Sequence, residues 1–256
     1  MGGKKSKPAA EAPLLDEPWR EINWKDKQRD LQHVNNFKHQ TEGQQLRILL
    51  HGPVGAGMSS FINSVNSVLQ GRMCTLALVD NTSHGCFSKE YTIYKIQKGS
   101  PETFYPFVFN DIMGLSQQES VLVDDVKLAL LGHVKEGYVV QHSLDSDTIH
   151  HETVQKIRDI RTEASRLGIP QVAVLTKVDK ACPEIRRDLK NIYRRKYLRE
   201  KMEEFSAHVG IPMNCTFPVK NYHEEIDISD DTDAVTLSTL RRIIDHGGDF
   251  INRKTV

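Results

Sequence analysis

The chain has 256 residues, and its 34 Lys and Arg residues balance its 34 Asp and Glu residues. This balance argues against a protein that coats nucleic acid through bulk positive charge. Because no window approaches the ~18 consecutive apolar residues of a membrane helix, we expect one large globular domain with an attached segment. The four cysteines form no CxxC pair, which predicts neither a zinc site nor a disulfide framework and indicates a reduced, intracellular protein.

The first residues match the pattern M-G-x-x-x-[ST], with Ser6 at the last position, and predict a myristoyl chain on Gly2. One acyl chain binds membranes only weakly, so peripheral association would need a second, electrostatic signal from the lysines of this segment, Lys4, Lys5 and Lys7. The alternative is a solvated leader without lipid, because this composition buries little surface. We assign residues 1–16 to a disordered leader and 17–44 to an N-terminal arm with helical stretches.

The remaining chain alternates between strand and helix patterns. An apolar run at 46–50 predicts a buried strand, and the helix after it should end at Gly71. Two runs predict a hairpin with its turn at 99–101, namely 91–96 and 104–109. Further helices are predicted at 116–131, 154–167, 183–209 and 235–251, and further strands at 171–175 and 215–219. We therefore expect an α/β domain over 45–252, with a mostly parallel sheet between helices on both faces, and a short tail at 253–256.

A glycine-rich loop joins the first predicted strand to its helix. It has the spacing G-x-x-x-x-G followed by a serine, as in a P-loop, but Met58 stands where the lysine belongs. Backbone N–H groups of such a loop converge on a phosphate, and Ser59 is placed to bind Mg²⁺. The candidate nucleotide-binding residues here are Gly52, Val54, Gly55, Ala56, Gly57, Met58, Ser59 and Ser60. Taken alone, the loop is equally compatible with an ordinary strand, turn and helix.

Two further motifs favour a nucleotide site. Asp111-Ile112-Met113-Gly114 fits D-x-x-G, in which the Asp holds Mg²⁺ through water and the Gly amide meets the γ-phosphate. Thr82 lies in a polar loop between the glycine-rich loop and D-x-x-G, where a threonine would reach Mg²⁺. The candidate metal ligands are thus Ser59, Thr82 and Asp111.

The base would be read at the end of the strand at 171–175. Thr176-Lys177-Val178-Asp179 fits [NT]-K-x-D, whose Asp accepts hydrogen bonds from guanine N1–H and the exocyclic amine, which adenine cannot offer together. The Lys177 stem would pack on the base. Lys220, after the last strand, is expected to supply a backbone contact. We therefore expect GTP or GDP with Mg²⁺ and disfavour an adenine kinase.

The residues in and around these motifs resemble those of the interferon-induced protein 44 and 44-like family. The matching segments are Gly52 to Phe61, Asn63 to Val68, Asp111 to Leu115, Leu175 to Asp179 and Pro218 to Tyr222. The resemblance implies a P-loop GTPase-like G domain related to dynamins and septins, in a cytoplasmic protein of the antiviral and immune response. It leaves the oligomeric state open.

Two residues, Met58 and Leu115, depart from the pattern expected of an active GTPase. Relatives carry lysine at Met58, and Leu115 replaces the glutamine with which small GTPases orient water, so we expect weak or absent hydrolysis. A non-hydrolysing scaffold that acts through protein or membrane contacts is the alternative function.

The segment before Asp145 is short, so a central strand is either lost or replaced by 138–144. We expect His150-His151 and the charged run at 184–204 to be solvated.

Overall fold

The computed structural model describes residues 14–38, 45–53, 55–78, 92–111, 126, 138–143 and 151–254. Within these residues, six strands form one sheet in the order β2-β3-β1-β4-β5-β6. The strands are β1 (Leu46–His51), β2 (Thr92–Lys98), β3 (Ser100–Asp111), β4 (Tyr138–Ser143), β5 (Gln171–Thr176) and β6 (Thr216–Pro218). Every neighbouring pair is parallel except the predicted hairpin of β2 and β3. The expected α/β, P-loop GTPase-like fold class is confirmed.

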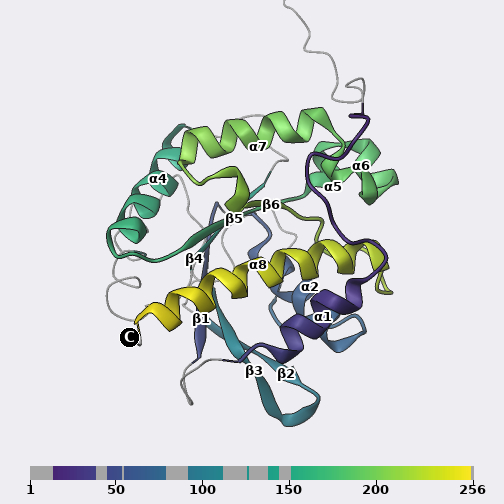
Figure 1. The fold of residues 1–256 in the computed structure, drawn as a ribbon, viewed down its shortest axis with the longest axis vertical. Helices are drawn as coiled ribbons and strands as arrows, with labels where there is room; N and C mark the ends of the chain where they lie inside the picture. Colours follow the sequence, from purple (N-terminus) through teal and green to yellow (C-terminus); the bar gives the residue numbers. More distant parts are fainter. Residues whose placement is uncertain are drawn as a thin grey trace, which may run out of the picture.

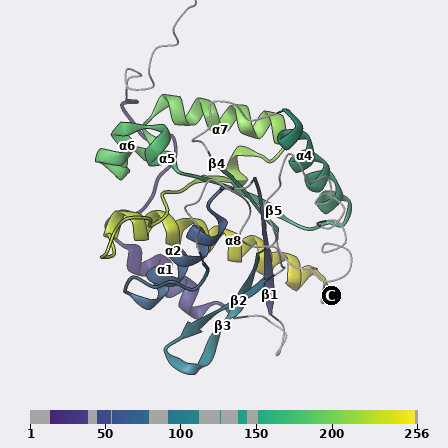
Figure 2. The ribbon, with the colours of Figure 1, turned by 180° about the vertical axis from the view of Figure 1, so that it is seen from behind.

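The helices of the described residues are α1 (Lys27–Asn36), α2 (Met58–Gln70), α4 (His151–Arg166), α5 (Val178–Ala181), α6 (Pro183–Arg187), η3 (Leu189–Tyr193), α7 (Lys196–Val209), η4 (Met213–Cys215) and α8 (Asp230–Lys254). Figure 1 shows α1 lying along α8, and α8 also packs against α2 and β1. Seen from behind in Figure 2, α4 and α7 lie together beside β5, away from α1. None of the helices in the described ranges is long and apolar enough to cross a bilayer. The predicted helix at 116–131 falls outside the described residues, apart from Val126.

The central strand predicted to be lost or replaced is present as β4. It pairs with β5 over six positions and with β1 over three, from Leu49 opposite Tyr138 to His51 opposite Val140. The segment at 138–143 therefore takes the central place in the sheet, and the order of strands is unbroken from edge to edge.

The core lies where β1 and β3 meet α2. The apolar face predicted for α2 is buried, and Phe61 packs edge-to-face on Phe109 of β3 with ring centroids 6.1 Å apart. Gly71 ends this helix in the left-handed conformation, as predicted. Because β1 has neighbours on both sides and helices over it, Leu46 and Ile48 are fully buried. This packing fixes the direction in which the chain leaves β1.

The charged region at 183–209 differs from its prediction in two ways. It is three short helices rather than one, because Asp188 adopts an extended conformation and Arg195 leaves the helical region again. The charged face is also not wholly solvated, since Arg195 is buried and forms an ion pair with Glu184. Hydrogen bonds from Arg195 and then from the Cys182 thiol lower the pKa of Glu184 to about 2.

The N-terminal arm is packed onto the domain from Leu14 onward, slightly earlier than the boundary predicted at residue 17. The Leu15 amide donates to the Arg194 carbonyl, and Trp19 packs edge-to-face on Tyr193 at 4.8 Å. Arg20 stacks over the Trp19 ring and donates to the carbonyl of Thr216, the first residue of β6. At the other end of the domain, α8 runs to Lys254, beyond the boundary predicted at 252.

Candidate functional site

The predicted phosphate loop, residues 52–59, lies between the end of β1 and the start of α2. Gly55 and Gly57 have φ of 78° and 82°, a left-handed conformation that favours glycine. The Ala56 amide donates to the Pro53 carbonyl, which closes a tight turn, and Gly57 is the residue before the first turn of α2. The glycines are thus where the backbone requires them. Val54 lies outside the described residues.

Two strand ends hold this loop from the side. Thr176, the last residue of β5, donates from Oγ1 to the Ala56 carbonyl at 2.6 Å. Asn221, three residues after β6, donates from Nδ2 to the Gly57 carbonyl at 3.1 Å. A Cβ on Gly57 would lie 3.2 Å from Asn221 Nδ2, so a side chain there would push this brace away. Because consecutive carbonyls bond to these side chains, the loop is held in one conformation from outside.

The start of α2 is open to an anion among the described residues. No side chain caps this helix, and its first turn carries no acidic residue of its own, so the helix dipole leaves a positive end there. Met58, at the position of the missing lysine, packs its half-buried side chain against the hydrophobic core. Ser60 uses its carbonyl to accept from the Ser64 hydroxyl. The loop therefore offers backbone N–H groups and a helix end to a phosphate, but no ammonium at residue 58.

Two of the predicted Mg²⁺ ligands are brought together. The register of β1 with β3 places Asp111 opposite Leu50, and Ser59 follows in the first turn of α2. Ser59 Oγ and Asp111 Oδ2 lie 3.4 Å apart, a long contact between a hydroxyl and a buried carboxylate. Such oxygen ligands suit Mg²⁺, which keeps several waters when it binds a protein. The other predicted residues here, Thr82 and Gly114, lie outside the described residues, as does Leu115.

The motif predicted to recognise guanine, residues 176–179, lies at a sharp turn after β5. Lys177 has φ 57°, and it is the one residue other than glycine with positive φ in the described part of the chain. Such a conformation costs on the order of 1 kcal/mol or more and concentrates at functional sites. The turn starts α5, whose first turn carries the half-buried Asp179. The motif thus projects from the strand end that also holds the phosphate loop.

Lys220 lies beside this motif. The Val219 amide donates to the Leu175 carbonyl at 2.7 Å, which extends the pairing of β6 with β5 and brings the next residue to the strand end. The Lys220 ammonium forms an ion pair with Glu225 at 2.7 Å. Burial opposes the charge of Glu225, but the His223 amide and Lys220 outweigh it and lower its pKa to about 2. Since its ammonium is already paired, Lys220 is better placed to offer its backbone than its charge.

Sequence reasoning missed two contributors to the site, Asn221 and Ser64. In the sequence, Asn221 stands out only as a neighbour of Lys220 after the last predicted strand, and its hydrogen bond to Gly57 depends on the sheet order. Ser64 sits inside α2, fully buried, and accepts from the Tyr222 amide at 2.9 Å. The available signal was a serine three residues after Phe61 and next to Val65, on the side of the helix predicted to be apolar, because a buried hydroxyl needs a partner. The predicted lipid site and its lysines, Gly2, Lys4, Lys5 and Lys7, lie outside the described residues.

No protein-family model matches the chain. Among curated proteins, interferon-induced protein 44 of Homo sapiens and that of Pan troglodytes are each 33% identical to it over 238 residues, covering 81% of this chain and 53% of the relative. The chain is a homologue of interferon-induced protein 44. Interferon-induced protein 44-like of Homo sapiens is also similar, at 28% identity over 240 residues. The predicted resemblance is confirmed, and the chain spans about half the length of the curated relatives it matches.

The alignment is 238 positions long, but the 81% of this 256-residue chain that it includes amounts to fewer residues than that. Some aligned positions of the relatives therefore have no counterpart in this homologue. Among solved structures, the small COPII coat GTPase of Encephalitozoon cuniculi in complex with GDP is 16% identical, with a TM-score of 0.44, covering 90% of this chain and 89% of that one. So loose a superposition carries no argument about function.

Proposed function

We propose that this chain binds guanine nucleotides with Mg²⁺ and hydrolyses GTP weakly or not at all. The observation that carries the proposal is the phosphate loop between β1 and α2, braced at the Ala56 and Gly57 carbonyls by Thr176 and Asn221. The same strand end carries the motif whose Asp would recognise guanine. A loop without function would not need two separate strand ends to fix its conformation.

The phosphates would lie against the backbone of residues 52–59 at the positive end of α2. Mg²⁺, when bound, supplies positive charge that neutralises the phosphate oxygens. Ser59 and Asp111 are the described residues that would hold it, since their oxygens already face each other. Thr82 and Gly114 are assigned to the same site from the sequence pattern alone.

The base would be held by Lys177, Asp179 and the backbone of Lys220. The carboxylate of Asp179 accepts two guanine hydrogen bonds, and an adenine would leave it with an unmatched acceptor. The left-handed turn at Lys177 follows Thr176, whose hydroxyl bonds to the phosphate loop, and this proximity in the chain supports the assignment. We infer that GDP and GTP bind in preference to ATP.

Turnover would be slow for two reasons. Met58 cannot give the charge-assisted hydrogen bonds that a P-loop lysine makes to the β- and γ-phosphates. Leu115, by its place in the sequence, cannot orient an attacking water. We infer that the protein acts through its nucleotide-bound state rather than through rapid hydrolysis, in the cytoplasm and in the antiviral response. Its relatives are named as interferon-induced proteins.

The second candidate is a scaffold that keeps the fold and binds no nucleotide. The observation that favours it is the packing of the half-buried Met58 side chain against the core, which gives residue 58 a structural role without a nucleotide. The two functions differ in one measurable property, because a scaffold would give no saturable response to any nucleotide.

Displacement of fluorescent GDP by GTP, GDP and ATP tests the proposal. We expect both guanine nucleotides to compete better than ATP, and Asp179→Ala to abolish the difference. Asp227→Ala, which changes an exposed aspartate of the β6–α8 loop, is the matched control and should keep the preference. Equal competition by ATP and GTP in the unmodified chain would refute guanine recognition, and no saturable binding would favour the scaffold.

A further inference from the structure

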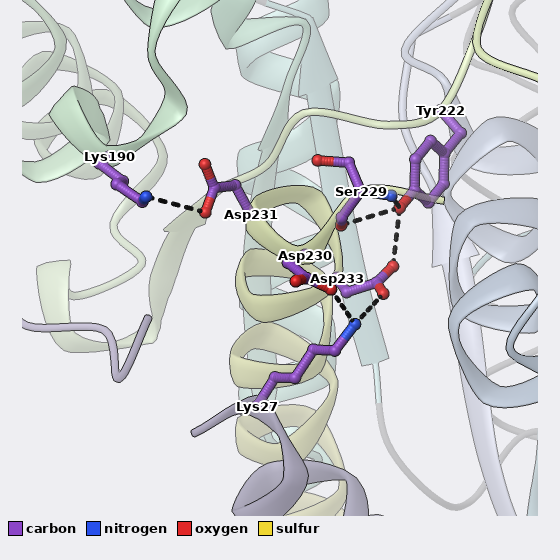
Figure 3. Close-up of polar contacts among 7 residues, drawn as sticks. All are labelled: Lys27, Lys190, Tyr222, Ser229, Asp230, Asp231 and Asp233. Atoms are coloured by element: carbon purple, nitrogen blue, oxygen red, sulfur yellow. Dashed lines mark hydrogen bonds and ion pairs between the residues drawn. The ribbon is translucent and has the colours of Figure 1, made fainter. Parts of the chain in front are cut away.

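The N-terminal arm contacts the nucleotide site through a chain of buried polar groups. Figure 3 shows these polar groups at the start of α8, where the Lys27 ammonium lies between the carboxylates of two aspartates. Lys27 Nζ is 2.6 Å from Asp230 Oδ1 and 2.7 Å from Asp233 Oδ2. Only Asp233 is buried, with 3% of its side chain exposed against 85% for Asp230. The contact that matters for the interior is therefore the one with Asp233.

The carboxylate of Asp233 is shared between the arm and the β6–α8 loop, residues 219–229. While one oxygen faces Lys27, the other accepts from the Tyr222 hydroxyl at 2.7 Å. The same hydroxyl accepts from the Ser229 amide at 2.7 Å, so both ends of the loop meet at one oxygen atom. A buried carboxylate needs such compensation, because burying an unpaired charge is costly.

Tyr222 in turn connects to the phosphate loop. Its amide donates to Ser64 Oγ in α2, and Ser64 donates to the carbonyl of Ser60 in the first turn of that helix. The residue before it, Asn221, braces the Gly57 carbonyl. Fixing the Tyr222 ring at its hydroxyl end therefore fixes the backbone that carries the Asn221 brace.

The arm is positioned to exert this effect because α1 runs alongside α8. Three residues spaced one turn apart on α1 make polar contacts with α8, and their partners follow the same order along α8 as these residues do along α1. Besides Lys27, Asp30 pairs with Arg241 at 2.7 Å and His33 with Asp245 at 2.6 Å. The latter two pairs lie farther along α8, while Lys27 meets its N-terminal end, which follows the β6–α8 loop.

We propose that Lys27 is a positioning residue of the nucleotide site, which holds Asn221 against the phosphate loop through Asp233 and Tyr222. The proposal rests on the proposed function and adds a requirement, that the arm be docked on α8 for full affinity. A partner or modification that detached the arm would weaken nucleotide binding without touching a nucleotide-binding residue.

The test combines hydrogen exchange without nucleotide with fluorescent GDP titration, on the full chain and four variants. Lys27→Met removes the ammonium, Lys27→Arg keeps a cation, and Tyr222→Phe removes only the hydroxyl. Lys190→Met is the matched control, because Lys190 pairs with Asp231 at 3.6 Å on the same helix end and makes no contact with Tyr222 in Figure 3.

We expect Lys27→Met and Tyr222→Phe to speed amide exchange at Asn221 and Tyr222 and to weaken GDP binding by about tenfold, the scale of one lost hydrogen bond. Lys27→Arg should recover most of the affinity, and Lys190→Met should change neither readout. Faster exchange confined to α1, or faster exchange at Asn221 with wild-type GDP affinity, would overturn the proposal.

The two proposals fail differently. If the unmodified chain binds no GDP, the proposed function is refuted and Lys27 loses its role at a nucleotide site. Exchange at Asn221 then reports only whether the arm holds the loop. If the unmodified chain binds GDP and Lys27→Met binds it equally well, the role of Lys27 alone is refuted.

Discussion

Thr176 and Ala56 lie 120 positions apart in the chain, and the hydroxyl of the first donates to the carbonyl of the second at 2.6 Å. Both residues are fully buried. This bond joins the end of β5 to the loop at residues 52–59, so that the two halves of the proposed site are held at a fixed separation.

The first prediction concerns that bond. Thr176→Val keeps the shape of the side chain but leaves the buried Ala56 carbonyl without this donor, at an expected cost of about 1–3 kcal/mol in the free energy of unfolding. Thr176→Ser keeps the hydroxyl and should lose less. Chemical denaturation of the three proteins measures the difference, and equal stability of the Val and Ser variants would show that the bond does not hold the loop.

The second prediction concerns His51, the last residue of β1. Burial lowers its pKa to about 3, so it stays neutral in the folded protein at pH values where the unfolded chain takes up a proton. The unfolded state then binds more protons, and stability falls as pH drops from 6.5 towards 3, by about 1.4 kcal/mol per pH unit for one such group.

Replacement of this histidine isolates its share of the pH dependence. Denaturation between pH 5 and 7.5 should give a flatter slope for His51→Gln than for the unmodified chain, whatever the change in absolute stability. His208→Gln, at an exposed histidine of α7, should leave the slope as it was. If both variants keep the original slope, His51 does not confer acid sensitivity.

The third prediction concerns the close approach of α8 to the sheet. A Cβ on Gly247 would lie 2.6 Å from Cδ1 of the buried Leu46, whereas one on Gly248 would lie 3.0 Å from the Phe37 ring. Alanine improves helix propensity by about 0.5–1 kcal/mol, but overpacking a core costs about 1–3 kcal/mol. We expect Gly247→Ala to lower the melting temperature more than Gly248→Ala does.

A double variant checks the cause of that loss. Leu46→Val removes bulk at the point of collision, so it should destabilise the Gly247→Ala background less than it destabilises the unmodified chain. Additive effects of the two substitutions would mean that Gly247 is not needed for close packing on β1.

The sequence predicted the elements whose signals are local. The strand at 46–51, its glycine-rich loop and the helix closed by Gly71 all follow from hydrophobic spacing and backbone requirements. The hairpin of β2 and β3 was predicted for the same reason. In each case the residues that define the element lie next to one another in the chain.

What the sequence could not predict depends on contacts between distant segments. The buried ion pair of Arg195 with Glu184 lies in a run of mixed charge that predicts a solvated helix, and only the fold shows which charges turn inward. The braces at Ala56 and Gly57 likewise require the order of β5 and β6. Local composition carries no information about either.

The measurement that tests the central claim most directly is calorimetric titration of GTP into the unmodified chain and into Met58→Lys. If residues 52–59 form a phosphate cradle that lacks only its cation, the variant should bind about 10- to 100-fold tighter, since a charged hydrogen bond contributes roughly 1.5–3 kcal/mol. Phosphate release should stay slow in both forms, because Leu115 is unchanged. Equal affinity of the two forms would contradict the account, as would brisk hydrolysis by the unmodified chain.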